Sequence, residues 1–288
     1  AVVGNSGTLL LTEYGREIDA HSAVFRLNAG RTAGFAKHVG SRTHFRLLNG
    51  LWTGKYPPLV GLLSTTSPGQ AANRCVCSRP PPASLVSATA RNNKASVLGL
   101  RHGQWVPLQN LSICILYRCM HAPRRVPLER KVTLIASRGN KLEANYVKLA
   151  QFMRAKRTDV STTLLHPDAL TRTRRALDSY RRCALAGGKR FSGGGAPSSG
   201  LVLVYNLKDI CGRVSVYGFG SDRVQGRAPA YQYYTRREGN PTHSFSAEME
   251  FIRSLAHSNY IRLCTAGSCI GAGTNNDSSL GGPRMEAL

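Results

Sequence analysis

Acidic residues are scarce in this chain, which has 15 Asp and Glu against 39 Lys and Arg and a formal net charge of +24 over 288 residues. So few carboxylates make a carboxylate-rich site for a divalent metal hard to build. An excess of Lys and Arg commonly serves nucleic-acid binding, but here the basic residues are scattered and no zinc-finger, RNA-recognition or helix-turn-helix pattern accompanies them. Two interpretations remain: a basic surface set by composition, and a general attraction for anionic donors and acidic glycans.

Long hydrophobic runs and cysteines at C-x-x-C spacing are also missing. No run of about 18 apolar residues, the length typical of a membrane-spanning helix, occurs anywhere in the sequence. The chain has 8 cysteines but no C-x-x-C pair, which argues against a structural zinc site. It begins with Ala rather than Met, so we interpret it as a portion of a longer protein whose targeting or membrane segment, if any, lies outside it.

Apolar runs alternate with helical patterns along most of the chain. Strands are predicted at residues 1–3, 23–28, 43–49, 113–117, 131–137, 162–165 and 214–219. Helices are predicted around 142–153, from Pro167 onward, over 201–207 and after His243, where apolar residues recur at helical spacing. This alternation predicts parallel strands with helices on both faces of one sheet. Residues 50–130 contain repeated prolines and are predicted to be an inserted loop.

Small polar residues follow several of the predicted strands. Gly4-Asn5-Ser6-Gly7 comes after the first strand, where small residues let backbone N–H groups approach an anion closely. The next two strands end on Asn28 and Asn49, whose amides can serve a ribose or a base at the carboxyl edge of a sheet. On these features alone, an ordinary turn between a strand and a helix explains the pattern as well as a nucleotide site does.

Two later segments have the chemistry of a transfer site. Pro197-Ser198-Ser199-Gly200 precedes the predicted 201–207 helix, whose N-terminus favours phosphate through free N–H groups and the helix dipole; Ser198 as N-cap is compatible with that role. His243 precedes another helix, for which Ser244 is the predicted N-cap. A helix N-terminus disfavours imidazolium and lowers the His pKa, so we expect a neutral His243 that can act as a general base.

Four segments resemble, in order, the motifs of the sialyltransferases, inverting transferases that use CMP-activated sugars. Residues 1–49 resemble the large sialylmotif, 197–220 the small sialylmotif, 231–234 the aromatic third motif, and 243–248 the H-x4-E motif. The resemblance implies an α/β fold of the GT-A-like type in its sialyltransferase variant. It implies one catalytic domain over residues 1–270, with 50–130 as a divergent insert, and a flexible tail over 271–288.

The resemblance also implies roles for individual residues. The donor nucleotide site is implied to comprise Asn5, Ser6, Gly7, Asn28, Ser198, Ser199, Gly200, Gly220, Gln232 and Tyr233. His243 is implied to be the catalytic base and Glu248 a supporting residue that positions it. Cys211 matches a family cysteine whose disulfide partner would precede Ala1. No metal and no other cofactor is implied, and the chain lacks the D-x-D pair with which most transferases of the related fold hold a divalent ion.

One motif position departs from the family pattern. Gln232 stands where many members have a His beside the donor phosphate, and Gln can donate a hydrogen bond there but no proton or full charge. With the long insert, this departure indicates a divergent plant- or alga-like member.

We therefore expect transfer of a sialic-acid-like 2-keto-3-deoxy sugar, Neu5Ac or Kdo, from a CMP-sugar to a glycan hydroxyl. The alternatives are a transferase with another donor sugar such as galactose, and a catalytically silent nucleotide- or glycan-binding relative. The expected partners are a CMP-sugar and a glycan acceptor, not nucleic acid, and the oligomeric state stays open.

Localisation is likewise implied only by the resemblance. Sialyltransferases are type II proteins of the Golgi membrane with a lumenal catalytic domain, so we expect an N-terminal anchor outside this chain. In an oxidising lumen some of the cysteines should be paired. N-glycosylation sequons begin at Asn110 and Asn276, which is compatible with secretion.

Overall fold

The computed structural model describes residues 1–64, 98–101, 104–107, 127–137, 143–220, 229–235, 239, 241–266 and 268–271. The chain divides into two compact units, one of residues 1–57 and 126–288 and the other of residues 58–125. The second unit contains a hairpin of β4 (Leu98–Arg101) and β5 (Gln104–Pro107). The domain boundaries expected from the sequence, 1–270 with an insert at 50–130, stay a prediction.

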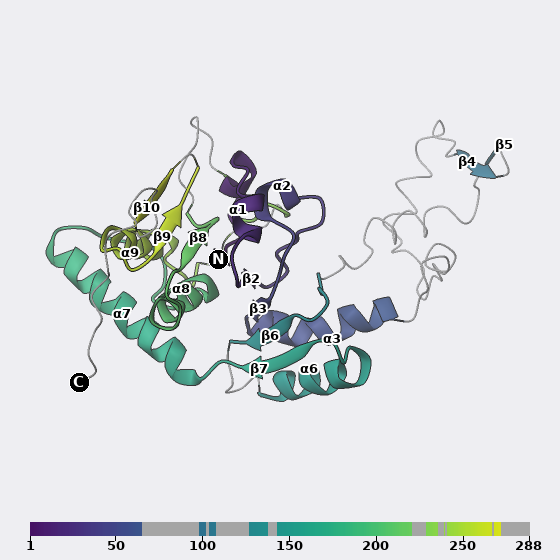
Figure 1. Ribbon diagram of the computed structural model, residues 1–288, viewed down its shortest axis with the longest axis horizontal. Helices are drawn as coiled ribbons and strands as arrows, with labels where there is room; N and C mark the ends of the chain where they lie inside the picture. Colours follow the sequence, from purple (N-terminus) through teal and green to yellow (C-terminus); the bar gives the residue numbers. More distant parts are fainter. Residues whose placement is uncertain are drawn as a thin grey trace, which may run out of the picture. The chain divides into compact units, whose positions relative to one another are not determined.

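The first unit is built on an eight-stranded sheet (Figure 1). In order across the sheet, its strands are β10 (Cys269–Gly271), β9 (Arg262–Cys264), β8 (Ser215–Tyr217), β1 (Val2–Val3), β2 (Phe25–Leu27), β3 (Phe45–Leu48), β6 (Thr133–Ala136) and β7 (Ser161–Leu164). All neighbouring pairs are parallel except β9 and β10. The predicted α/β fold with a mainly parallel sheet is therefore confirmed.

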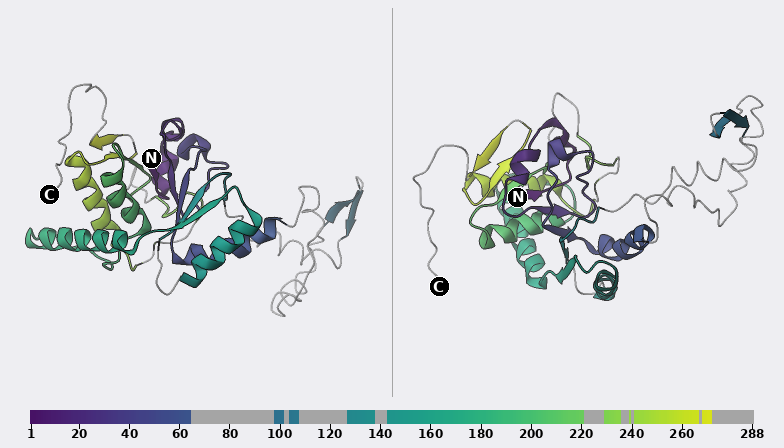
Figure 2. Two further views of the ribbon diagram at one scale, coloured as in Figure 1. Left: turned by 60° about the horizontal axis from the view of Figure 1, so that its bottom comes forward. Right: turned by 45° about the vertical axis from the view of Figure 1, so that its right-hand side comes forward.

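Side chains alternate between the two faces of the sheet, as the two-residue period of a strand requires. In β1, Val2 joins one apolar core and Val3 joins another; in β8, Val216 and Tyr217 divide in the same way. The first core is completed by α8 (Ser199–Ile210) and α9 (Phe245–His257), and the second by η1 (Gly7–Leu11), α1 (Gly15–Asp19) and α2 (Ala36–Val39) (Figure 2). Helices thus cover both faces, as predicted.

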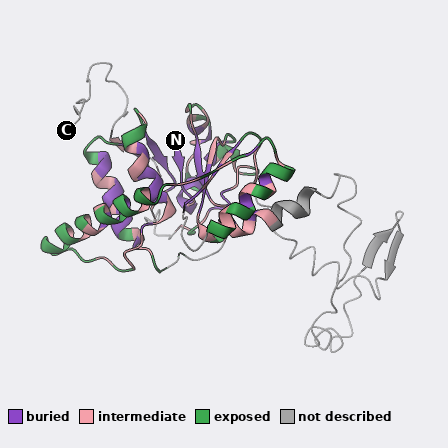
Figure 3. Ribbon diagram, turned by 90° about the horizontal axis from the view of Figure 1, so that it is seen from below, coloured by how far each residue is buried: buried purple, intermediate pink, exposed green. Residues whose placement is uncertain are grey.

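Helix α7 (Pro167–Ala186) packs outside α8 and α9. It begins where the sequence predicts, with Pro167 in its first turn and the His166 imidazole accepting a hydrogen bond from the Asp168 N–H. Thr173 and Leu177 are buried, whereas the opposite side of the helix is exposed and rich in Arg (Figure 3). The helix α6 (Glu143–Lys156) likewise agrees with the prediction and buries Leu149 and Met153.

The first part of the predicted insert is helical rather than a loop. The helix α3 (Gly50–Ser64) runs through Pro57 and Pro58, in a segment predicted to be a loop. At its start Asn49 Oδ1 accepts a hydrogen bond from the Trp52 N–H over 3.0 Å, an N-cap that the sequence analysis did not consider. Strand β10 ends at Gly271, the first residue of the predicted tail, and the flexibility of the tail stays a prediction. Residues 113–117 and 272–288 lie outside the described residues.

No helix among the described residues combines the length and the apolarity that crossing a bilayer requires.

Candidate active site

A cavity of about 300 Å³ opens where β1, β2, β3 and β8 end. Its lining includes the residues that follow the carboxyl ends of these strands, from Gly4 after β1 to Gly220 after β8. The strand order changes direction between β1 and β8, because the chain proceeds outward from β1 to β7 on one side and from β8 to β10 on the other. Ligands of open α/β sheets bind at such switch points.

Most residues proposed for the site from the sequence line this cavity. They come from four separate segments and are Asn5, Ser6, Asn28, Ser198, Ser199, Gly200, Gly220, Gln232, His243 and Glu248. Gly7 and Tyr233 are not among the lining residues. The Gly7 N–H donates to Ala230 O over 2.8 Å, and the buried Tyr233 donates its hydroxyl hydrogen to Arg31 O. These two residues therefore support the structure around the cavity through hydrogen bonds and do not line it.

One backbone and one side-chain hydrogen bond from Ser6 join the turn after β1 to the turn after β8. The Ser6 N–H donates to Gly218 O over 3.0 Å, and Ser6 Oγ donates to Gly220 O over 2.7 Å. A Cβ on Gly4 would lie 2.2 Å from Gly218 O, so the two turns can approach this closely only with glycine at position 4. The Tyr233 N–H donates to Asn5 O over 2.8 Å and adds a third segment to the same wall.

Two asparagines offer side-chain amides at this edge of the sheet. Asn5 Oδ1 is buried and has no hydrogen-bond partner among the described residues. A buried acceptor without a donor costs about 1–3 kcal/mol, which a ligand donor would recover. Asn28 has a left-handed backbone, with φ of 49°, and its Oδ1 accepts from the Asn49 N–H over 2.9 Å. Asn28 Nδ2 is therefore the group that this side chain can offer to a ligand.

A buried arginine supports the turn at Asn28. Arg46 of β3 is fully buried, and its Nη1 donates to Asn28 O over 2.8 Å and to Gly30 O over 3.0 Å. Its charge is compensated by an ion pair with Glu129. The Tyr56 hydroxyl also donates to Asn28 O, over 3.1 Å. The sequence analysis did not select Arg46. Nothing in the local sequence indicates that an Arg within one β-strand donates hydrogen bonds to the turn that follows the neighbouring strand.

Ser198 begins α8 and is held by Glu248 from α9. Ser198 Oγ accepts from the Leu201 N–H over 3.2 Å, which confirms its expected role as N-cap. The N–H and the hydroxyl of Ser198 donate to the two Glu248 carboxylate oxygens over 2.8 and 2.5 Å. Because both Ser198 donors are engaged, the N–H groups of Ser199 and Gly200 are the ones left for an anion at this helix N-terminus. Burial raises the pKa of Glu248 to about 7.

His243 lies two residues before α9 and lines the cavity. Its Nδ1 is 2.7 Å from Ala196 O. A carbonyl only accepts hydrogen bonds, so the contact assigns the proton of the neutral ring to Nδ1 and leaves Nε2 as its basic nitrogen. Ser244 occupies the predicted N-cap position of α9, but its hydroxyl donates to Ser192 O and its side chain makes no cap hydrogen bond to the helix.

Aromatic side chains that the sequence analysis did not select stand beside His243. The Phe245 ring centroid is 5.5 Å from that of His243 and 5.3 Å from that of Tyr231, which is 40% exposed. Both Phe245 and Tyr231 line the cavity, as does Phe219 after β8. Their proximity in sequence to selected site residues could have indicated them, since Tyr231 directly precedes Gln232 and Phe245 follows His243 by two residues.

The comparison with known sequences agrees with this geometry. A sequence model of glycosyltransferase family 29 (sialyltransferase) matches residues 1–54 and 130–260. The chain belongs to this family.

Individual relatives match over different lengths. Sialyltransferase-like protein 3 of Oryza sativa subsp. indica is 28% identical over 266 residues, which cover 88% of this chain and 55% of that protein. Beta-1,6-galactosyltransferase GALT29A of Arabidopsis thaliana is 55% identical over 49 residues, 17% of this chain and 12% of that protein. The chain thus spans about half or less of the length of these curated relatives.

A solved structure has the same fold. The crystal structure of a mammalian sialyltransferase superposes with a TM-score of 0.51 at 19% sequence identity, covering 92% of this chain and 67% of that one. The fold expected from the family resemblance is therefore confirmed.

The position at which this family member departs from the motif pattern faces the cavity. Gln232 lines it, and its Oε1 accepts from Thr235 Oγ1 over 2.9 Å. With its oxygen engaged, Gln232 can offer its amide N–H groups to a ligand. A phosphate could accept such a hydrogen bond but would gain no positive charge from it.

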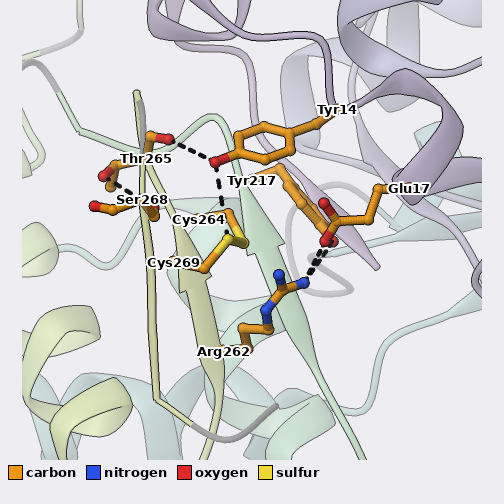
Figure 4. Close-up of a disulfide and its surroundings, with 8 residues drawn as sticks. All are labelled: Tyr14, Glu17, Tyr217, Arg262, Cys264, Thr265, Ser268 and Cys269. Carbon is orange, nitrogen blue, oxygen red and sulfur yellow. Dashed lines mark hydrogen bonds and ion pairs between the residues drawn. A yellow bond between two sulfur atoms is a disulfide. The ribbon is translucent and has the colours of Figure 1, made fainter. Parts of the chain in front are cut away.

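A disulfide joins two strands at the edge of the sheet (Figure 4). Cys264 of β9 and Cys269 of β10 lie opposite each other in the antiparallel pair. Beside them, Glu17 forms an ion pair with Arg262 and accepts a hydrogen bond from the Tyr217 hydroxyl over 2.7 Å. Glu17 and the two sulfurs lie within reach of one metal ion, but the sulfurs are bonded to each other. The sequence analysis did not assign this pair.

The disulfide expected for Cys211 is not tested by the structure. Cys211 is a free, half-buried thiol that lines a second cavity together with Ala1. Its expected partner precedes Ala1, so this disulfide stays a prediction. Cys183 is free and exposed. The remaining cysteines and the asparagines of both glycosylation sequons lie outside the described residues: Cys75, Cys77, Cys114, Cys119, Asn110 and Asn276.

Proposed function

We propose that this family 29 member is an inverting glycosyltransferase that moves a sialic-acid-like 2-keto-3-deoxy sugar, Neu5Ac or Kdo, from a CMP-sugar to a glycan hydroxyl. The observation that carries the proposal is the convergence of four separate motif segments on one cavity, whose wall includes both His243 and the N-terminus of α8. A base and an anion site in one cavity are what transfer from a nucleotide monophosphate sugar needs.

The donor is assigned to the turns after β1 and β2 and to the start of α8. Asn5 Oδ1 and Asn28 Nδ2 supply an acceptor and a donor for the ribose or the cytosine. The N–H groups of Ser199 and Gly200, together with the dipole of α8, stabilise the single phosphate. Glu248 holds Ser198, and so the first turn of α8, in place. Gln232 adds an amide donor at the same cavity.

His243 is assigned the role of general base. Its Nε2 takes the proton from the acceptor hydroxyl while that oxygen bonds to the anomeric carbon of the sugar. The bond between this carbon and the phosphate oxygen breaks, and CMP leaves with the electron pair. Attack on the face opposite the departing CMP inverts the anomeric configuration. The Ala196 carbonyl supports this role because it keeps the proton of the neutral ring on Nδ1.

We propose that the transfer needs no metal ion. Among the described residues that line the cavity, Glu248 is the only one with a carboxylate, and Ser198 already engages both of its oxygens. A Mg²⁺ or Mn²⁺ site would need further oxygen ligands there. Transfer is therefore expected to proceed at an unchanged rate in excess EDTA, and its loss in EDTA with recovery on adding Mn²⁺ would contradict the proposal.

We place the protein in the Golgi lumen, held as a type II membrane protein by an anchor outside this chain. The family resemblance suggests this localisation. The disulfide between Cys264 and Cys269 supports it, because such bonds persist in oxidising compartments and are rare in the cytosol.

A second donor is favoured by one specific observation. A stretch of 49 residues is 55% identical to an Arabidopsis protein named as a galactosyltransferase, the same identity as to a rice protein named as sialyltransferase-like. Similarity at this level does not discriminate between the sugars, and UDP-galactose is the alternative donor.

The donor assay separates the candidates. The protein is incubated with CMP-Neu5Ac, CMP-Kdo or UDP-galactose and a panel of glycans in EDTA, and the released nucleotide is measured beside calorimetric titrations with CMP and UDP. Release of CMP in proportion to product is expected. Transfer from UDP-galactose alone would select the second donor, CMP binding without transfer would select the silent relative, and absence of CMP binding would refute a CMP site.

A further inference from the structure

A glycine-rich segment between α7 and α8 lies against the residues that carry His243. We call residues 192–196 (Ser-Gly-Gly-Gly-Ala) the glycine strap. The Gly194 N–H donates to Pro241 O over 3.1 Å, and Ser192 O accepts from the Ser244 hydroxyl. A run of glycines is typical of a flexible loop, whereas the strap is hydrogen-bonded to residues on both sides of His243.

The strap approaches the His243 backbone as closely as glycine allows. A Cβ on Gly193 would lie 2.4 Å from His243 O, and one on Gly194 would lie 2.4 Å from Thr242 O. Gly193 also has a φ of +87°, a conformation that L side chains rarely adopt. Two residues further on, the strap ends at Ala196, whose carbonyl accepts from His243 Nδ1. The position of the strap therefore sets the position of the imidazole.

Arg181 of α7 is also hydrogen-bonded to the strap. Its Nη1 donates to Gly194 O over 3.1 Å and its Nη2 to Gly193 O over 3.4 Å. The guanidinium presents these donors in a rigid planar fork, so it fixes two consecutive carbonyls at once. Its helix is fixed in turn, because Thr173 and Leu177 are buried against the rest of the unit. Arg181 is not among the residues that line the cavity, so it has no direct access to a ligand there.

We propose that Arg181 is a positioning residue for the base: it fixes the glycine strap, and the strap keeps His243 in one tautomer and one orientation. This inference rests on the proposed function for the role of His243. Three consecutive glycines have no side chains with which to hold a conformation, so the strap depends on contacts made by others. Without Arg181, Ala196 O is free to move away from Nδ1, and the imidazole then populates both tautomers and rotates.

The kinetic test compares Arg181→Ala with Arg175→Ala. Arg175 is exposed on the same helix, so its replacement makes the same change in charge without touching the strap. For Arg181→Ala, we expect kcat to fall about 10²-fold, as for a misplaced catalytic group, while the donor KM and the CMP Kd stay unchanged. Arg181→Lys should restore part of the rate, since an ammonium can still donate to one of the two carbonyls. Arg175→Ala should keep the wild-type kcat.

The spectroscopic test does not depend on turnover. Proton–nitrogen-15 correlation spectra of the imidazoles report which ring nitrogen carries the proton, and the His243 signals are identified by their loss in His243→Ala. A single tautomer protonated on Nδ1 is expected in the wild type and in Arg175→Ala, and a mixture of tautomers in Arg181→Ala. A single unchanged tautomer in a folded Arg181→Ala would overturn the proposal, as would equal kcat losses in both Arg variants.

A second pair of variants covers the case in which Arg181→Ala does not fold. Gly193→Ala places a Cβ against His243 O, whereas Gly188→Ala has a similar φ of +79° but meets nothing within 4 Å. We expect the loss of kcat and the mixed tautomers in Gly193→Ala and not in Gly188→Ala, and identical behaviour of the two would refute the strap. If the unmodified protein transfers no sugar, the proposed function fails, while the spectra still decide whether Arg181 positions His243.

Discussion

Glu248 is buried in the wall of the cavity and is not a solvent-exposed side chain. Burial raises its pKa from an ordinary value of 4.5 to about 7, and the two hydrogen bonds from Ser198 oppose that rise. Folding therefore binds a proton at Glu248 between these two pH values. The stability that this proton confers is complete below about pH 4.5 and is lost as the pH rises through about 7.

Glu248→Gln should remove this part of the pH dependence. The free energy of unfolding of the wild type, from urea titrations between pH 4.5 and 8, should fall with rising pH by up to about 3 kcal/mol more than that of the variant. Glu250→Gln on the same helix is the matched control. Lys189 lowers the pKa of Glu250, so its stabilising effect is present at neutral pH and lost as the pH falls. Parallel curves for the wild type and Glu248→Gln would show that Glu248 does not titrate on unfolding.

Asn5→Ala tests the contribution of a single residue of the donor site to CMP binding. Removing Oδ1, the buried acceptor without a partner, should weaken CMP binding by about 1–2 kcal/mol, roughly 5- to 30-fold, while the melting temperature changes little. Asn145→Ala makes the same substitution on α6, outside the cavity lining, and should leave the CMP affinity unchanged. Equal CMP affinities for the wild type and both variants would remove Asn5 from the site.

Local sequence could indicate some of these residues and not others. Asn5 and Asn28 follow apolar runs at what became the carboxyl ends of β1 and β2, and this much is readable from a strand pattern. The bond between Glu248 and Ser198 joins residues 50 positions apart, and Arg46 acts on a turn 18 residues earlier. Such roles depend on which elements pack together, and no spacing within a segment encodes that.

Short elements at the edge of the sheet obtain their stability from tertiary bonds. The hairpin of β9 and β10 has three residues in each strand, and its disulfide closes a loop with a sequence separation of 5. In the chain-entropy account, a loop of this size contributes about 2 kcal/mol by restricting the unfolded state. The hairpin also packs against α9, which carries Glu248.

Removing the disulfide should therefore cost measurable stability. We expect the double variant Cys264→Ala, Cys269→Ala to lose about 2 kcal/mol in urea unfolding under non-reducing conditions. Cys211→Ala removes a free thiol and is expected to cost less. An unfolding midpoint equal to that of the wild type in the double variant would mean that the bond does not stabilise the fold.

The lengths of the elements explain which of them the sequence could predict. Runs such as residues 131–137, rich in β-branched side chains, predicted their strands correctly, and the amphipathic α6 and α7 were predicted from their apolar spacing. The helices α1 and α2 have five and four residues, which is too short for a 3.6-residue period to emerge. In α3 two adjacent prolines suggested a break, although the Asn49 cap and the surrounding packing sustain the helix.

At the scale of the whole molecule, the site exists because β8 pairs in parallel with β1. The register places Val216 beside Val2 and Tyr217 beside Val3, which brings the turn at 218–220 against the turn at 4–6. A parallel pairing between strands some 200 residues apart follows from long-range packing, so the strand patterns alone did not specify it. The family resemblance placed both turns in one donor site, and the sheet topology gives the physical reason for that placement.

The central claim is that these converged turns form a transfer site in which His243 is the base. The most direct test measures sugar transfer from CMP-Neu5Ac and CMP-Kdo by the wild type and by His243→Ala, with CMP calorimetry on the same preparations. The account predicts that the turnover of His243→Ala falls about 10²- to 10⁴-fold while the CMP affinity barely changes, because the proton acceptor is needed only in the transition state. Substantial retained turnover in His243→Ala would contradict the assignment of the base, and lost CMP binding would make His243 a donor ligand instead.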